Sequence, residues 1–229
     1  MCWSGEASFT LATIGFTGAA FAAYRKEPVF RWLPLAYFSG METLQGFTYS
    51  WIGQCGNDFN HWLTILSYLH IAFQPFFVSM FSLSFLSSEQ RKKASWIWIA
   101  CAITAVVMLS MFLFPSIPGN CSIEGQSLCG PSICSYHGNW HIAWMLKLSN
   151  LDPHYFSYWI TVFILPFLFK GWRFTLYHLF LGPLLAFALT TDKNEQPAIW
   201  CLLSIAFLLA THVPVLNKLL LTKEAKIEH

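Results

Sequence analysis

Long apolar stretches, separated by short breaks that carry charges or turn-forming residues, recur along the whole 229-residue chain. Only 10% of the residues are charged, whereas a typical soluble protein has about 25%. A helix of about 20 apolar residues crosses the hydrocarbon core of a bilayer, so lipid is the natural solvent for such stretches. The pattern predicts an all-α, polytopic membrane protein, a single domain (1–229), with seven transmembrane helices at 7–24, 29–49, 61–86, 95–115, 154–171, 173–191 and 197–221.

The basic residues of this seven-helix arrangement gather on one side of the membrane. Of the 13 lysines and arginines, only Lys147 and Lys193 fall on the other side. Cytoplasmic loops carry an excess of Lys and Arg, so the split predicts an N-terminus outside and a C-terminus in the cytoplasm. The residues on the basic side are Arg25, Lys26, Arg31, Arg91, Lys92, Lys93, Lys170, Arg173, Lys218, Lys223 and Lys226.

Five of the seven cysteines fall on the predicted outer side, which an oxidising compartment would allow to form disulfides. Five candidates permit one or two bridges and leave at least one thiol unpaired, and their spacing does not assign the pairs. The plasma membrane, a bacterial inner membrane and the endoplasmic reticulum membrane all satisfy this expectation. The candidates are Cys2, Cys55, Cys121, Cys129 and Cys134.

The segment 116–153 is predicted to be a cysteine-rich outer loop. Its first half carries proline and glycine among the cysteines, which is typical of a cross-linked loop. In its second half, Trp140 and Trp144 lie four residues apart and would share one face of a helix. We therefore expect a short helix at 140–146 that lies in the membrane interface.

Two ionisable residues, Glu42 and His70, lie inside predicted helices at a similar depth in the outer half of the membrane. Ionisable groups are costly there, so each is a candidate functional residue. Each belongs to a polar stripe at helical spacing, and such stripes are expected to face one another around a polar cavity rather than to face lipid. The stripes are Ser39, Glu42, Gln45 and Tyr49, then Ser67, His70 and Gln74, then Thr10, Thr13 and Thr17.

His137 and His141 form an H-x3-H pattern, which on a helix places both imidazoles on one face and suits zinc or another divalent transition metal. If this segment lies over the cavity, His70 and Glu42 would complete the ligand set. An open position would hold a water whose pKa the metal lowers towards about 7. The structural alternative is that Glu42 carries a proton and bonds a neighbouring helix, with a neutral His70 bonded to it.

Two short motifs resemble those of alkaline ceramidases and adiponectin receptors. These families are seven-helix zinc hydrolases of lipid amides, with a Ser and a His on helix three and an H-x3-H pair on helix seven. The present sequence is similar in Ser67 and His70 and in an H-x3-H that ends in Trp140 and His141. Its Ser–His spacing is one residue shorter, and its H-x3-H precedes helix five. The resemblance implies a membrane-embedded zinc hydrolase.

The sequence thus predicts a metal-dependent hydrolase that acts on a lipid or other amphiphile from an outer polar cavity. Glu42 would be a metal ligand or general base, and Ser67 and Gln74 would polarise the substrate carbonyl or orient water. Two alternatives stay open: a transporter or channel for a small solute or ion that uses Glu42 and His70, and a sensor or assembly protein without catalysis. Membrane lipids are expected partners. No basic block interleaved with aromatics appears, so no nucleic-acid partner is expected.

Overall fold

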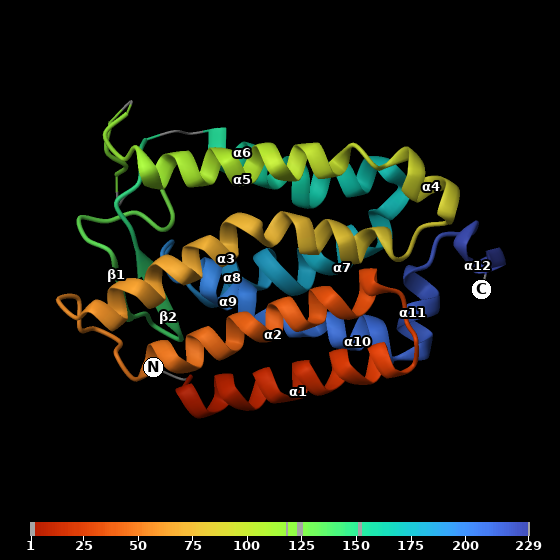
Figure 1. Cartoon of the computed structure of the whole chain (residues 1–229), viewed down its shortest axis with the longest axis horizontal. Helices are drawn as coiled ribbons and strands as arrows, with labels where there is room; N and C mark the ends of the chain where they lie inside the picture. Colours follow the sequence, from red (N-terminus) through yellow and green to blue (C-terminus); the bar gives the residue numbers. More distant parts are fainter. Residues whose placement is uncertain (1–2, 118, 123–125, 151–152, 229) are drawn as a thin grey trace.

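The computed structural model describes residues 3–117, 119–122, 126–150 and 153–228. Most of these residues are helical, and the longer helices lie side by side as a bundle (Figure 1). The N-terminus and a small hairpin lie at one end of the bundle, and the C-terminus lies at the other. The prediction of an all-α architecture is therefore confirmed in its main feature, with one short strand pair added to it.

The first half of the chain contains long helices joined by short turns. Ser4 begins the first of them, because its hydroxyl accepts from Ala7 N at 3.3 Å. Asn57 caps the third in the same way, since its side chain accepts from Phe59 N at 2.8 Å. The helices are α1 (Gly5–Tyr24), α2 (Val29–Tyr49), α3 (Asp58–Leu83), α4 (Ser88–Lys93) and α5 (Ile97–Leu113).

The second half is more irregular, and several of its helices run into short π-helical or 3-10 stretches. One run is divided at Lys170, whose φ of 69° breaks the helix. The elements are α6 (Pro153–Trp159), η1 (Ile160–Ile164), η2 (Phe167–Gly171), α7 (Trp172–Leu179), η3 (Phe180–Leu184), α8 (Leu185–Leu189), α9 (Gln196–Leu203), η4 (Ser204–Ala206), α10 (Phe207–His212), α11 (Pro214–Leu220) and α12 (Ala225–Glu228).

Three helical segments in the described ranges are long and apolar enough to cross a membrane: Gly5–Tyr24, Asp58–Leu83 and Phe156–Leu189. A fourth, Gln196–His212 with Pro214–Leu220, qualifies only if its 95° bend counts as one broken span. This finding supports a multi-pass membrane protein. The count of seven spans and the orientation remain predictions.

An antiparallel hairpin of β1 (Cys134–His137) and β2 (Ile142–Met145) crosses the N-terminal end of the bundle (Figure 1). The expected interfacial helix at 140–146 is therefore wrong. Trp140 is 44% exposed whereas Trp144 is fully buried, so the two rings do not share a face. The physical reason is a tertiary one: β2 finds its hydrogen-bond partners in β1, which local helical spacing cannot reveal.

Two disulfides among the described residues hold the hairpin end of the bundle, within the one or two that the cysteine positions allow. Cys55–Cys134 ties the turn between α2 and α3 to β1, and Cys121–Cys129 closes a small loop before β1. Cys2 lies outside the described residues.

Asn60, at the start of α3, adds polar contacts at this hairpin end of the bundle. It is buried, donates to the carbonyls of Trp51 and Ser135, and accepts from Ser135 N at 2.9 Å. The hairpin is thus fixed against α3 by both covalent and hydrogen bonds.

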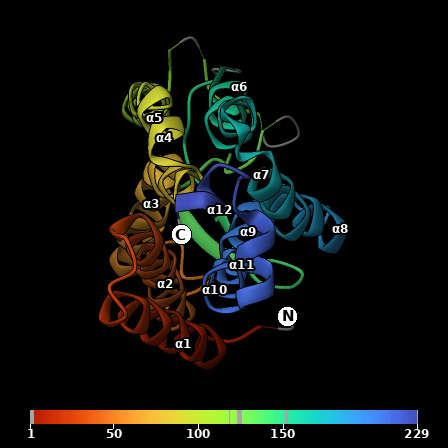
Figure 2. The same ribbon diagram turned by 90° about the vertical axis from the view of Figure 1, so that its right-hand side faces the viewer.

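Aromatic side chains fill the bundle towards the C-terminal end of α3. Phe81 stacks on Phe207 with ring centroids 4.6 Å apart, and Phe174 and Phe38 pack edge-on against Phe207. Figure 2, which looks along the helices, shows α2 and α3 on one side of this core and α7 and α9 on the other.

Candidate functional site

His141 precedes β2 and reaches from the hairpin into the bundle, where it is 1% exposed. Its Nε2 lies 2.7 Å from Gln45 Oε1, and its Nδ1 lies 2.6 Å from the Tyr49 hydroxyl. An amide oxygen only accepts, so Nε2 carries the proton and Nδ1 accepts from Tyr49. Burial lowers the pKa of His141 to about 3, which keeps the imidazole neutral.

Glu195 fixes the backbone that carries this imidazole. Its Oε1 accepts from Trp140 N and His141 N, each at 2.5 Å, and its Oε2 accepts from the Thr190 hydroxyl at 2.5 Å. A Cβ at Gly138 would lie 2.6 Å from the Glu195 carboxyl carbon, so the turn needs glycine there. The fully buried carboxyl thus sets the position of His141 from the turn before α9.

Glu42 lies one turn before Gln45 on the buried face of α2 and is 1% exposed. Neither of its oxygens has a hydrogen-bond partner in the part of the chain that the structure describes, and the same holds for Gln45 Nε2. Ser8 of α1 lies beside the carboxyl, and Cys201 of α9 lies close enough to interact with its charge. Helices α1, α2 and α9 therefore meet around an unbonded carboxyl group.

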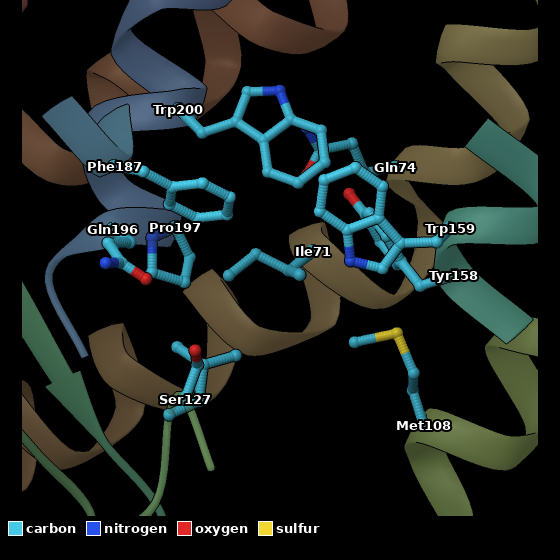
Figure 3. Close-up of a pocket in the computed structure, with 11 residues that line it drawn as sticks. Ile71, Gln74, Met108, Ser127, Tyr158, Trp159, Phe187, Gln196, Pro197 and Trp200 are labelled. Carbon is cyan, nitrogen blue, oxygen red and sulfur yellow. The ribbon is translucent and has the colours of Figure 1, made fainter. Parts of the chain in front are cut away.

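A cavity of about 130 Å³ lies on the other side of this cluster, between α3, α5, α6, α8 and α9 (Figure 3). Gln74 forms its polar wall: the side-chain oxygen is 3.9 Å from Cys201 Sγ, and Nε2 is buried without a partner among the described residues. Ser127 and Gln196 add polar groups at its edge (Figure 3). The remaining wall is apolar or aromatic: Ile71, Met108, Leu128, Tyr158, Trp159, Phe187, Pro197 and Trp200.

The structure does not bring Glu42 and His70 together. His70 stacks on Tyr37 with ring centroids 3.7 Å apart and lines an open groove of about 1000 Å³ between α2 and α3. Gly40 and Leu44 line the same groove, and at 100° per residue they lie on the face of α2 opposite Glu42. The two ionisable residues therefore belong to different sites.

The predicted zinc ligands do not converge either. His137 ends β1 with its side chain exposed, and both ring nitrogens of His141 are already hydrogen-bonded. Over the described ranges, no group of three or more His, Cys, Asp or Glu residues is placed to hold a metal ion. The residues present do not fit a metal centre built from His70, His137, His141 and Glu42.

Two of the predicted stripes need correction. Thr10, Thr13 and Thr17 lie on the exposed face of α1, and the first two hydroxyls bond the carbonyls one turn back. The residue of α1 that reaches the cluster is Ser8. Ser67 is buried, but its hydroxyl also bonds its own helix, at Leu63 O.

Sequence reasoning found Glu42, Gln45, Tyr49, Gln74 and His141 but missed others. The sequence could have indicated that Ser8 is buried, because it begins a stripe of small residues at helical spacing that α1 packs against its neighbours. No such pattern indicated the roles of Glu195 and Trp200, since their roles depend on how the hairpin and α9 dock.

The chain matches, over residues 6–221, a family described only as a family of unknown function, DUF5765. No curated protein and no solved structure matches the chain. The comparisons therefore add membership of a family and no activity.

Proposed function

Since the chain belongs to the DUF5765 family of unknown function, we propose from the site alone that it is a ligand-binding protein of the membrane. It crosses the bilayer seven times and binds a small amphiphilic molecule from the outer side, in the cavity beside Gln74. The observation that carries the proposal is the buried Gln74 Nε2, which lacks a hydrogen-bond partner among the described residues and lies in a largely apolar and aromatic wall. A buried polar group without a partner is costly unless a ligand or water satisfies it.

The arrangement of the chain supports this topology. The disulfides and the hairpin lie at the N-terminal end, where an oxidising outer compartment would place them (Figure 1). The basic breaks before α2, around α4 and at Lys170 lie at the opposite end, as expected for a cytoplasmic face. The non-helical backbone at Lys170 separates two helices within the long segment, which supports counting it as two spans in this proposal.

The cavity specifies a class of ligand. Its volume of about 130 Å³ is close to the roughly 150 Å³ of a cavity known to hold one benzene ring. Trp159, Phe187 and Trp200 would contact a ring or a short chain, and Gln74 Nε2 would donate to an acceptor oxygen on it. We therefore expect a monocyclic or short-chain molecule with one carbonyl or hydroxyl oxygen.

Binding fits this geometry better than metal-assisted hydrolysis or conduction. Ser67, predicted to polarise the substrate carbonyl or orient water, and His141, predicted to hold the metal, both make their hydrogen bonds within the protein. Conduction needs a polar path from the cavity to the inner face. Where such a path would run, Phe81, Phe174 and Phe207 pack against one another. A cavity that is closed on the inner side is suited to a receptor or to one state of a carrier.

The test uses fluorinated benzamide, benzylammonium and toluene as probes, followed by fluorine NMR of the protein in lipid nanodiscs. We expect benzamide to bind most tightly. Gln74→Leu should weaken benzamide by roughly two- to tenfold, because one hydrogen bond is lost, and should leave toluene unchanged.

Ile71→Phe is the matched control, because its ring would fill the cavity and should abolish binding of every probe. Equal binding to the wild type and to Ile71→Phe would refute the site. Preferential binding of benzylammonium would instead contradict the acceptor-oxygen class and indicate a cation held by the aromatic wall.

A further inference from the structure

Glu42 is an ionisable side chain that the ligand cavity does not use. It is fully enclosed, it makes no ion pair with any described Lys or Arg, and both carboxyl oxygens lack a hydrogen-bond partner there. An ionised carboxylate in such surroundings is strongly disfavoured, whereas a protonated one is tolerated. We propose that Glu42 is a proton-binding site that exchanges its proton with the outer side of the membrane through the Ser8 hydroxyl.

The groups that face Glu42 come from each element packed against it. Helix α1 contributes Ser8, α9 contributes Cys201, and α2 itself contributes Tyr49. The hairpin contributes neutral His141, which reaches the carboxyl only through Gln45. Glu195 lies further out and is held by backbone N–H groups and Thr190. No described cation therefore balances Glu42, so a proton is the group that neutralises it.

Ser8 connects the carboxyl to the outer surface. Its hydroxyl accepts from Trp3 Nε1 at 2.9 Å, and this bond leaves the hydroxyl proton free to turn towards Glu42. Trp3 and Tyr49 line a groove of about 490 Å³ between the outer ends of α1 and α2, next to the exposed Glu6. Ser8 is fully buried and does not line this groove itself, so the Trp3 indole separates its hydroxyl from the solvent-facing groove.

A hydroxyl both donates and accepts, so it can pass on a proton without carrying a lasting charge. When Trp3 moves aside and water from the groove reaches Ser8, Glu42 passes its proton to the Ser8 oxygen as Ser8 passes its own proton to that water. The carboxylic acid becomes a carboxylate, one proton enters the outer solution, and no electron moves. Uptake reverses these steps. Gln45 cannot serve as this relay, since its amide oxygen is bonded to His141.

Infrared difference spectroscopy of the full-length protein in nanodiscs tests the site. The pH is cycled between about 4 and about 10, a range that brackets the ordinary pKa of Glu on both sides. We expect a carboxylic-acid C=O band from a dehydrated group that disappears as pH rises. Glu42→Gln should remove this band, and Glu42→Asp should shift it. The exposed Glu6 serves as control, and Glu6→Gln should leave the band unchanged.

A pH jump followed by time-resolved infrared detection tests the route. Ser8→Ala should keep the Glu42 band and slow its decay severalfold, whereas Thr10→Ala, on the exposed face of α1, should not. Absence of a titrating band, or its survival in Glu42→Gln, would overturn the proton site. A Ser8→Ala rate equal to that of the wild type would overturn the route. Neither variant changes a residue of the Gln74 cavity, so this test and the ligand test fail independently.

Discussion

The Glu195 Oε1 atom accepts the His141 backbone N–H at 2.5 Å, across a sequence separation of 54 residues. A carboxyl group in the turn before α9 therefore decides where the imidazole of the hairpin stands. Since His141 in turn bonds Gln45 and Tyr49, one buried carboxyl orients the polar groups at the hairpin end of the bundle.

Replacing Glu195 should loosen this end of the molecule. Glu195→Ala leaves Trp140 N, His141 N and the Thr190 hydroxyl without an acceptor, and each orphaned buried group costs about 1–3 kcal/mol. We expect a clear fall in the thermal unfolding midpoint in detergent and faster proteolysis within the hairpin. Glu6→Ala, which removes an exposed carboxyl, is the control. Equal stability of the two variants would contradict the role given to Glu195.

Stability should depend on pH through His141. Its pKa is about 3 in the folded protein, against about 6.5 in an unfolded chain. Between these values the unfolded state binds a proton that the folded state does not. The contribution of neutral His141 to the free energy of unfolding is therefore complete above about pH 6.5. It is lost as pH falls towards 3, by about 1.4 kcal/mol per pH unit. Melting curves of the wild type and His141→Gln should diverge in this direction, and parallel curves would refute the assignment.

The two disulfides should differ in their effect. Cys55–Cys134 joins residues 79 apart and Cys121–Cys129 joins residues 8 apart, so loop-closure entropy predicts roughly 4.5 and roughly 2.5 kcal/mol. Replacing the first pair by alanines should lower the unfolding midpoint more than replacing the second. Removing Cys55–Cys134 should also weaken the contact of His141 with Gln45. The reverse ranking would show that the hairpin is held by its hydrogen bonds.

Metal analysis separates the ligand cavity from the predicted zinc centre. We expect protein purified without added metal to hold well below one transition-metal ion per chain, because His141 has no free ring nitrogen and His70 faces another site. Zinc close to one per chain, lost in both His70→Ala and His141→Ala, would contradict this and restore the hydrolase.

Two glycines of the bundle should respond oppositely to alanine. A Cβ at Gly15 would lie 2.1 Å from Ser39 Oγ and 3.1 Å from Ser39 Cβ, so Gly15→Ala must displace the Ser39 hydroxyl or push α1 away from α2 and should cost about 1–3 kcal/mol. A Cβ at Gly40 meets nothing within 4 Å, so Gly40→Ala should be neutral or stabilise by up to about 1 kcal/mol. Unfolding midpoints in one detergent provide the comparison.

Sequence patterns predicted the features that depend on residues close together in the chain, namely the helices and the polar face of α2. Apolar runs predict helices wherever they reach the length of a bilayer, and polar spacing on α2 correctly grouped Glu42, Gln45 and Tyr49 on one side of the helix. Spacing does not reveal which neighbour that side meets, because helix rotation is set by packing. The sequence therefore paired Glu42 with His70, although His70 of α3 packs against the face of α2 opposite Glu42.

The hairpin is a second case in which local spacing could not predict a tertiary contact. His137 and His141 suggested one helical face, yet they are separated by the turn between two strands. The pairing of β1 with β2, the Cys55–Cys134 bond and the contact with Glu195 all join residues far apart in sequence or opposite across a ladder. Each depends on the completed tertiary structure, so no local pattern contains it.

The Glu195 contact also sets the order in which the hairpin end is completed during synthesis. A chain emerges from the ribosome N-terminus first, so α1 to α3 and the hairpin are synthesised before α9. Until Glu195 is synthesised, the His141 backbone N–H lacks its acceptor and the hairpin end of the bundle stays incomplete. A nascent chain arrested before α9 would present Cys55 and Cys134 to oxidation without the late contact that sets the hairpin. The cell therefore completes this site only after most of the protein has been translated.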